Sequence, residues 1–225
     1  MNLPAIATKE DQREVPRVPR EDNKLRLEDR AAHDWYRFVL SYPAHLVRTY
    51  VDRFGLAPTN NVLDPFCGTG TTLVECKKLG IQSYGIEPNP MAAFASRTKV
   101  DWEIAPDNLV THANRIAQLA SDKFTSEGIE DEGGLPLLET KNRILPHLKT
   151  LPPDALKLLL TDSISPLPLH KTLVLLETLE ENSDPRLAAH EHLALAKTLR
   201  AFGWRAHSTG LALRMSRRAW CGWRW

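Results

Sequence analysis

The stretch from residue 61 to residue 99 limits the possible folds of this chain more than any other segment. Two short strand-like runs, 61–64 and 81–87, each end in a carboxylate, and helical patterns follow them at 71–79 and 90–99. Strand, helix, strand and helix in this order predict a parallel βαβ unit with a right-handed crossover. We therefore expect an α/β fold that binds its ligand at the carboxyl ends of these strands.

A loop that contains two glycines joins the first strand to its helix. Residues 64–72 read Asp-Pro-Phe-Cys-Gly-Thr-Gly-Thr-Thr. Gly68 and Gly70 remove side chains where a ligand can approach the backbone, and the amides that start the helix can hold an anionic group. Glu87 follows about 20 residues later, where an acid typically accepts hydrogen bonds from ribose hydroxyls. The pattern predicts an adenosine derivative; the alternative is that the glycines only make a tight turn.

The identity of position 73 distinguishes between adenosine derivatives. The fingerprint for dinucleotides requires a third glycine three residues after the second, and this chain has Leu73 there. A turn that binds pyrophosphate is therefore disfavoured. S-adenosylmethionine carries no phosphate, and its ammonium and sulfonium groups suit a carboxylate such as Asp64 beside the loop.

These residues resemble the cofactor motif of the amino-methylating DNA methyltransferases, which modify N4 of cytosine or N6 of adenine. Residues 62–99 follow the family pattern, from the first strand through Asp-Pro-Phe-Cys-Gly-Thr-Gly-Thr-Thr-Leu-Val-Glu to Gly-Ile-Glu-Pro-Asn-Pro. The resemblance implies that Asp64 and the loop hold the methionine part of S-adenosylmethionine and that Glu87 holds its ribose. It also implies a Rossmann-like methyltransferase sheet, incomplete in this chain, with a helical insert.

Residues 40–46 resemble a second family motif, which lies upstream of the first strand and contacts the methionine end of the cofactor. The alternative for Tyr42 and Pro43 is a helix start, followed by the apolar helical pattern of 47–54. The cofactor-binding residues that the resemblance implies are Tyr42, Pro43, Ala44, Asp64, Pro65, Phe66, Gly68, Thr69, Gly70, Thr71, Thr72, Glu87 and Pro88.

The loop also resembles that of certain tRNA guanine methyltransferases, and a relative of these enzymes is an alternative. We expect a DNA substrate, because only 63 residues precede Asp64, too few for the RNA-binding domain of those enzymes. The family transfers its methyl group at an Asp, Asn or Ser followed by Pro-Pro and an aromatic residue, which stacks on a flipped base. No such tetrad occurs in this sequence, and the nearest candidates, 151–154 and 165–168, are better interpreted as helix starts. We therefore assign no catalytic residue; the alternative to a methyltransferase is a catalytically silent module that binds the cofactor or a partner.

The last 26 residues differ in composition from the rest of the chain. Residues 200–225 contain six arginines, four of the six tryptophans and no acidic residue. We interpret this tail as foreign or out of frame in a truncated or frameshifted member of the family; the alternative is a basic aromatic patch that binds nucleic acid. Residues 1–199 carry 23 basic and 28 acidic side chains, and this excess of negative charge disfavours binding to the phosphates of a nucleic acid.

Composition and periodicity predict the remaining organisation. We expect a disordered charged arm at 1–30, the S-adenosylmethionine-binding α/β unit at 31–105 and a helical region at 106–199, with helices near 106–124, 153–160, 168–181 and 184–202. His190 and His192 lie two apart, on different faces of a helix, so we predict no metal site. Three cysteines and the lack of a long apolar stretch favour a cytoplasmic protein without a membrane span; the oligomeric state is left open.

Overall fold

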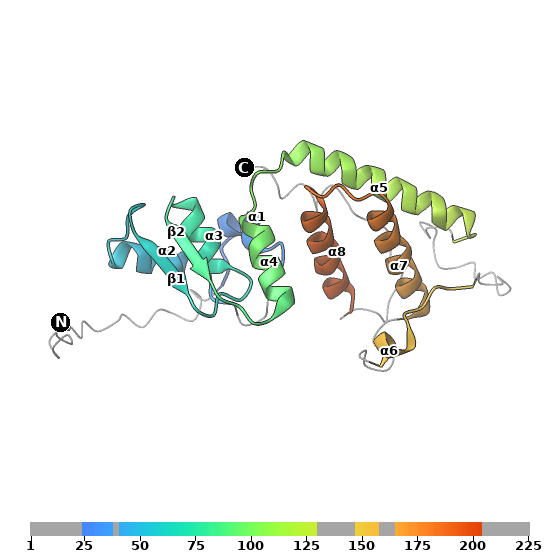
Figure 1. The fold of residues 1–225 in the computed structure, drawn as a ribbon, viewed down its shortest axis with the longest axis horizontal. Coiled ribbons are helices and arrows are strands. Elements are labelled where there is room, and N and C mark those ends of the chain that lie inside the picture. Colours follow the sequence, from blue (N-terminus) through green and yellow to red (C-terminus); the bar gives the residue numbers. More distant parts are fainter. Residues whose placement is uncertain (1–23, 38–40, 130–146, 158–164, 204–225) are drawn as a thin grey trace.

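The computed structural model describes residues 24–37, 41–129, 147–157 and 165–203. Figure 1 shows two parts side by side, a small α/β part that holds both strands and a group of long helices. Most of the predicted arm, residues 1–23, and most of the predicted tail, residues 204–225, lie outside the described residues. The last three residues of the helix expected at 153–160 also lie outside them.

The predicted βαβ unit is confirmed. Strand β1, Asn61–Asp64, pairs in parallel with β2, Gln82–Gly85, and helix α3, Thr71–Lys78, forms the crossover. The register sets Asn61 opposite Gln82 and Asp64 opposite Gly85. β2 is shorter than the expected 81–87, yet Ile86 N still donates to Asp64 O at 2.9 Å. Among the described residues the sheet has two strands, which is compatible with an incomplete methyltransferase fold.

The helix boundaries follow local chemistry. Gly80, with φ of 68°, lies just beyond the end of α3, in the left-handed conformation that ends many helices. Asn89 caps α4, Pro90–Val100, because its side chain accepts hydrogen bonds from the amides of Met91 and Ala92. Both boundaries were expected from the sequence.

Helix α2, Ala44–Arg53, starts three residues before the apolar pattern that predicted it. Pro43 precedes it in an extended conformation and so serves as its N-cap residue. Val51 of α2 packs with Cys76 of α3 and Ile81 in a buried apolar cluster, and this contact holds α2 against α3.

The end of the predicted arm differs in the structure. Residues Leu27–Asp29 form a 3-10 helix, η3, and Arg30–His33 form α1. Asp29 is only 2% exposed because both of its carboxylate oxygens accept hydrogen bonds from Arg48. Mixed charge suggested solvated chain up to residue 30, but a buried ion pair fixes this segment.

The helical region consists of α5, Pro106–Ser126, the short α6, Pro153–Leu156, then α7, Pro166–Glu181, and α8, Ala188–Gly203. Helix α8 begins four residues later than expected, because residues 185–187 form a turn. The backbone amides of Arg186, Leu187 and Ala188 donate hydrogen bonds to Asp184 there. Ile116, Leu179 and Leu195 form one buried cluster between α5, α7 and α8.

Contacts of Trp35, α4 and α8 join the two parts. Helix α8 packs against α4, and the rings of Trp35 and His190 meet edge to face with centroids 5.7 Å apart. The Nε2 atom of His190 lies 3.2 Å from Asp101 O, at the end of α4. Within the described residues no helix is long and apolar enough to cross a membrane, and no three His, Cys, Asp or Glu side chains gather as metal ligands would.

One face of the sheet is open. Leu63 and Tyr84 are register partners and are 62% and 54% exposed, and Ile86, beyond the end of β2, is 58% exposed. Parallel sheets are normally covered on both faces. The described part of this chain therefore presents an apolar surface that a further layer of structure would cover.

Gly70 holds α3 close to α4, and substitution tests this packing. A Cβ at Gly70, where φ is 85°, would lie 2.8 Å from Ser96 Cβ, whereas one at Gly128, where φ is 72°, would meet nothing within 4 Å. Gly128→Ala carries only the left-handed backbone cost, about 1–2 kcal/mol. We expect Gly70→Ala to lower the free energy of unfolding by about 1–3 kcal/mol more than Gly128→Ala does, because its Cβ overpacks against Ser96. Denaturant unfolding measures both; equal losses would contradict the close approach.

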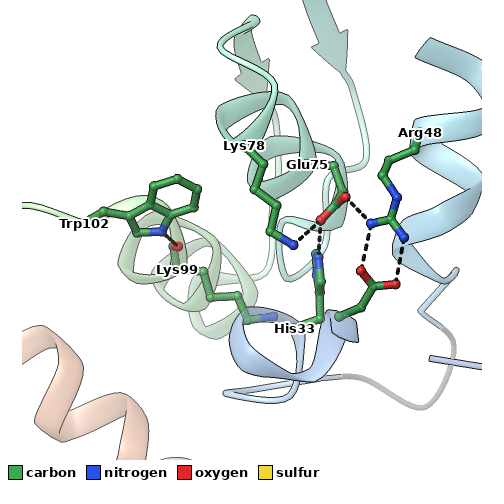
Figure 2. A network of polar contacts seen from close by, with 7 residues as sticks. His33, Arg48, Glu75, Lys78, Lys99 and Trp102 are labelled. Carbon is green, nitrogen blue, oxygen red and sulfur yellow. Dashed lines mark hydrogen bonds and ion pairs between the residues drawn. The ribbon is translucent and has the colours of Figure 1, made fainter. Parts of the chain in front are cut away.

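Lys99 makes stability depend on pH in an unusual direction. Its side chain is 1% exposed on α4 and points toward α1 (Figure 2). Burial, and then the charge of Arg37, lower its pKa from 10.5 to about 7, although Asp34 raises it. Between these two values the unfolded chain binds more protons than the folded one, so the free energy of unfolding rises with pH.

We expect the wild-type chain to be more stable at pH 9.5 than at pH 7.5, and Lys99→Met to remove that increase. The exposed Lys157→Met variant serves as the control and keeps it. Thermal unfolding at both pH values measures the difference. The same increase in Lys99→Met would show that another group causes it.

Candidate functional site

The two acidic residues singled out in the sequence lie at neighbouring strand ends. Asp64 is the last residue of β1, opposite Gly85, and Glu87 follows Gly85 by two residues. The loop is tied to the second strand, because Cys67 N donates to Ile86 O at 3.1 Å. Both carboxylates therefore belong to one edge of the sheet, as expected for parallel strands.

Three donors hold the Asp64 carboxylate. Its Oδ2 accepts hydrogen bonds from the Tyr42 hydroxyl at 2.9 Å and the Thr72 hydroxyl at 2.6 Å, and its Oδ1 accepts one from Phe66 N at 3.1 Å. Burial of the Tyr42 hydroxyl, opposed by Thr72 and reinforced by Asp64, raises the pKa of Tyr42 to about 12. The structure thus brings the upstream segment, the strand end and the first turn of α3 together.

The Glu87 carboxylate spans the loop and the following turn. Its Oε2 accepts a hydrogen bond from Gly68 N at 2.9 Å, and its Oε1 accepts one from Asn89 N at 2.8 Å. An ionised carboxylate has about four acceptor positions, so each oxygen keeps one for a ligand donor. Glu87 is half-buried, which leaves it accessible to such a ligand.

The two loop glycines have different roles. Gly68, with φ of 52°, faces open space, since a Cβ there would meet nothing within 4 Å. Gly70 closes a turn through its amide, which donates to Cys67 O at 2.8 Å, and faces Ser96 of α4. Both were expected to make room for a ligand; the space beside Gly68 is open, and the position of Gly70 permits the close packing of α3 against α4.

The other predicted residues divide into buried and exposed groups. Pro43, Ala44, Thr69 and Thr71 are buried, so they can offer a ligand mainly their backbone, whereas Pro65, Phe66 and Pro88 are exposed. Phe66, at 81% exposed, presents its ring beside the loop. The amides in the first turn of α3 have no acceptor within their own helix, as at any helix start.

Cys67 has a packing role. It is 5% exposed, and a Cβ at Gly85 would lie 2.7 Å from its Sγ. Burial, and then the charge of Asp64, raise the pKa of its thiol. A protonated, buried thiol is a poor nucleophile.

The sequence interpretation missed a buried charge network beneath the site. Glu75, fully buried on α3, contacts His33 of α1, Arg48 of α2 and Lys78 of its own helix (Figure 2). The sequence feature that could have revealed this network is an acidic residue between Val74 and Cys76, three residues after Thr72, on the inner face of the predicted helix. Carboxylates in such positions are almost always paired.

Comparison with known proteins gives a family match over the same part of the chain. Residues 11–95 match the family model of N6/N4-type methyltransferases, described as DNA methylase. The match includes the upstream segment, the loop, both strands and the first turns of α4. No solved structure matches the chain significantly.

Curated relatives match a similar length of chain. The Type II methyltransferase M.BsoBI of Geobacillus stearothermophilus is 37% identical over 71 residues, which are 32% of this chain and 14% of that protein. M.MjaII of Methanocaldococcus jannaschii is 44% identical over 73 residues, or 29% of this chain and 14% of the relative. M.AvaI of Nostoc sp. is 33% identical over 57 residues, which are 25% of this chain and 12% of that protein.

The matched segments thus span about one seventh of the length of the relatives M.BsoBI and M.MjaII. The match falls on the part of the chain in which Asp64, the glycine loop and Glu87 are brought together. Over residues 11–95, this chain is related in sequence to the amino-methylating DNA methyltransferases.

Proposed function

We propose that the chain binds S-adenosylmethionine between the glycine loop and Glu87. The observation that carries the proposal is the position of two carboxylates, Asp64 and Glu87, at adjacent strand ends on either side of Gly68. The open space above Gly68 supports the fit, because a ligand can lie against the loop backbone there.

Glu87 would hold the ribose. Its two oxygens already bind the amides of Gly68 and Asn89, which fixes the carboxylate plane and leaves one acceptor position on each oxygen. Two adjacent hydroxyls match two such positions. An ionised acceptor makes these hydrogen bonds about twice as strong as neutral ones.

Asp64 and Tyr42 would line the methionine end. The Asp64 charge favours the ammonium and sulfonium groups, while the first-turn amides of α3 favour the carboxylate. The pKa of Tyr42, raised to about 12, keeps its hydroxyl protonated up to strongly alkaline pH, so the hydroxyl remains a donor to Asp64 or Thr72. The exposed ring of Phe66 offers an apolar surface beside the loop.

We further propose that the complete protein transfers the methyl group to the exocyclic amine of a DNA base, N4 of cytosine or N6 of adenine. The relatives are named Type II methyltransferases and the family model is described as DNA methylase, which supports this substrate. S-adenosylmethionine supplies the electrophilic methyl group when bound. In this proposal residues 31–105 are the cofactor-binding unit of a Rossmann-like sheet.

A second candidate is a module that binds the cofactor without transferring its methyl group. The chain has no Asp, Asn or Ser followed by Pro-Pro and an aromatic residue, which favours this candidate for the chain by itself. The two candidates share the cofactor site and differ only in turnover.

The ribose assignment predicts a loss of affinity in Glu87→Ala. Losing hydrogen bonds to a charged group costs about 1.5–3 kcal/mol, or roughly ten- to a hundredfold in the dissociation constant for S-adenosylmethionine. Glu103→Ala, which removes an exposed carboxylate after α4, is the control and keeps wild-type affinity. Isothermal calorimetry measures both variants; unchanged affinity in Glu87→Ala would refute the assignment.

The missing tetrad predicts binding without turnover. We expect this chain to bind S-adenosylmethionine in equilibrium dialysis but to transfer no labelled methyl group to DNA. Unmethylated DNA that contains many sequences serves as substrate, with a complete Type II methyltransferase as the positive control. Methylated cytosine or adenine in the digested DNA would overturn this prediction and favour the enzyme over the silent module.

A further inference from the structure

We propose that Arg48 is a positioning residue for the cofactor site, which fixes the start of α2 and thereby holds the Tyr42 hydroxyl against Asp64 and Thr72. The inference rests on the proposed function for its effect on S-adenosylmethionine. The positioning itself is a property of the apoprotein and can be measured without the cofactor.

Arg48 joins three segments of the chain. Its Nη1 donates to Glu75 at 2.5 Å and to Asp29 at 2.7 Å, and its Nη2 donates to the other oxygen of Asp29 at 3.0 Å (Figure 2). Asp29 is 2% exposed and Glu75 is fully buried. Arg48 therefore ties α2 both to α3 and to the segment before α1.

Both partners of the Arg48–Glu75 pair are charged. Burial alone would raise the pKa of Glu75, but hydrogen bonds from His33, Lys78 and Arg48 together lower it to about 2. The hydrogen bonds that Arg48 donates to Asp29 are the largest cause that raises the pKa of Arg48. A planar guanidinium that binds buried carboxylates in a fork fixes direction as well as distance.

The geometry links this pair to the cofactor loop. Tyr42 bonds to Thr72 at 2.6 Å, and Arg48 bonds to Glu75, so the segment at 42–48 meets α3 at two points. Residues 72 and 75 are three apart and share one face of α3. Val47 and Val51 of α2 also pack against the apolar cluster with Cys76, and the guanidinium of Arg48 adds a directed polar contact at Glu75.

The segment between the two points is short and has little freedom. Only Pro43 lies between Tyr42 and the start of α2 at Ala44, and both Pro43 and Ala44 are buried. A rotation of α2 about its axis therefore moves Tyr42 directly. Without Arg48 we expect Tyr42 to leave Asp64, which exposes the Asp64 carboxylate to water and misaligns the methionine end.

The test combines Arg48→Met with Tyr42→Phe in a double-mutant cycle on the dissociation constant of S-adenosylmethionine. Arg48→Met alone should weaken binding about fivefold or more, and it should change affinity less than about twofold when Tyr42→Phe is already present. Arg48→Lys, which keeps one charged contact, should give an intermediate loss and guards against a failure of Arg48→Met to fold.

Lys78→Met is the matched control. Lys78 contacts the same Glu75 oxygen as His33, at 2.7 Å, but it lies on α3 itself, so this contact joins α3 to no other helix in the described part of the chain. Its loss should change affinity less than about twofold. Equal losses in Lys78→Met and Arg48→Met, or additive losses in the cycle, would reduce Arg48 to a structural role and overturn the inference.

Ionisation of Tyr42 gives a readout that needs no cofactor. Absorbance at alkaline pH, compared with Tyr42→Phe, reports this one residue among the four tyrosines. The pKa of Tyr42 should fall from about 12 toward its ordinary value of 10.0 in Arg48→Met and stay high in Lys78→Met. If the pKa of Tyr42 falls in Arg48→Met but the wild-type chain binds no S-adenosylmethionine, only the proposed function is contradicted. If the pKa of Tyr42 stays unchanged in Arg48→Met, the positioning role of Arg48 is contradicted.

Discussion

The pairing of β1 with β2 is the constraint on which the rest of the structure depends. Parallel pairing in the observed register places Asp64 opposite Gly85, so the acidic residues that end the two runs lie at one edge of the sheet. The crossover requires the chain to pass over the sheet as α3, and the loop that begins this helix then lies between the carboxylates. A shift of one residue would separate them.

The two-stranded sheet receives most of its support from the helices on one side. Isolated pairs of strands are marginal in water, and here α3 packs on β2 while α2 packs on α3. The Glu75 network adds buried charge to this packing. Breaking a buried pair by removing one partner typically costs about 3–5 kcal/mol, because the remaining charge is left uncompensated. The exposed face around Leu63 and Tyr84 shows where support is lacking in the described residues.

Local patterns predicted much of this arrangement, because their causes are local. Gly80 and Asn89 mark helix boundaries through backbone conformation and capping, and the sequence predicted helices with these limits, at 71–79 and 90–99. The different roles of Gly68 and Gly70 could not be predicted, since Ser96, which faces Gly70, lies 26 residues away in sequence. Likewise the burial of Asp29 depends on Arg48, a contact between segments that no periodicity encodes.

The central claim is that S-adenosylmethionine binds against the glycine loop and Glu87, and amide chemical shifts of the isotope-labelled chain test it most directly. On addition of S-adenosylmethionine, we expect the amides of Gly68, Thr69 and Asn89 to shift and those of α5 and α7 to stay unchanged. Shifts confined to the helical region, or none at saturating concentration, would contradict it.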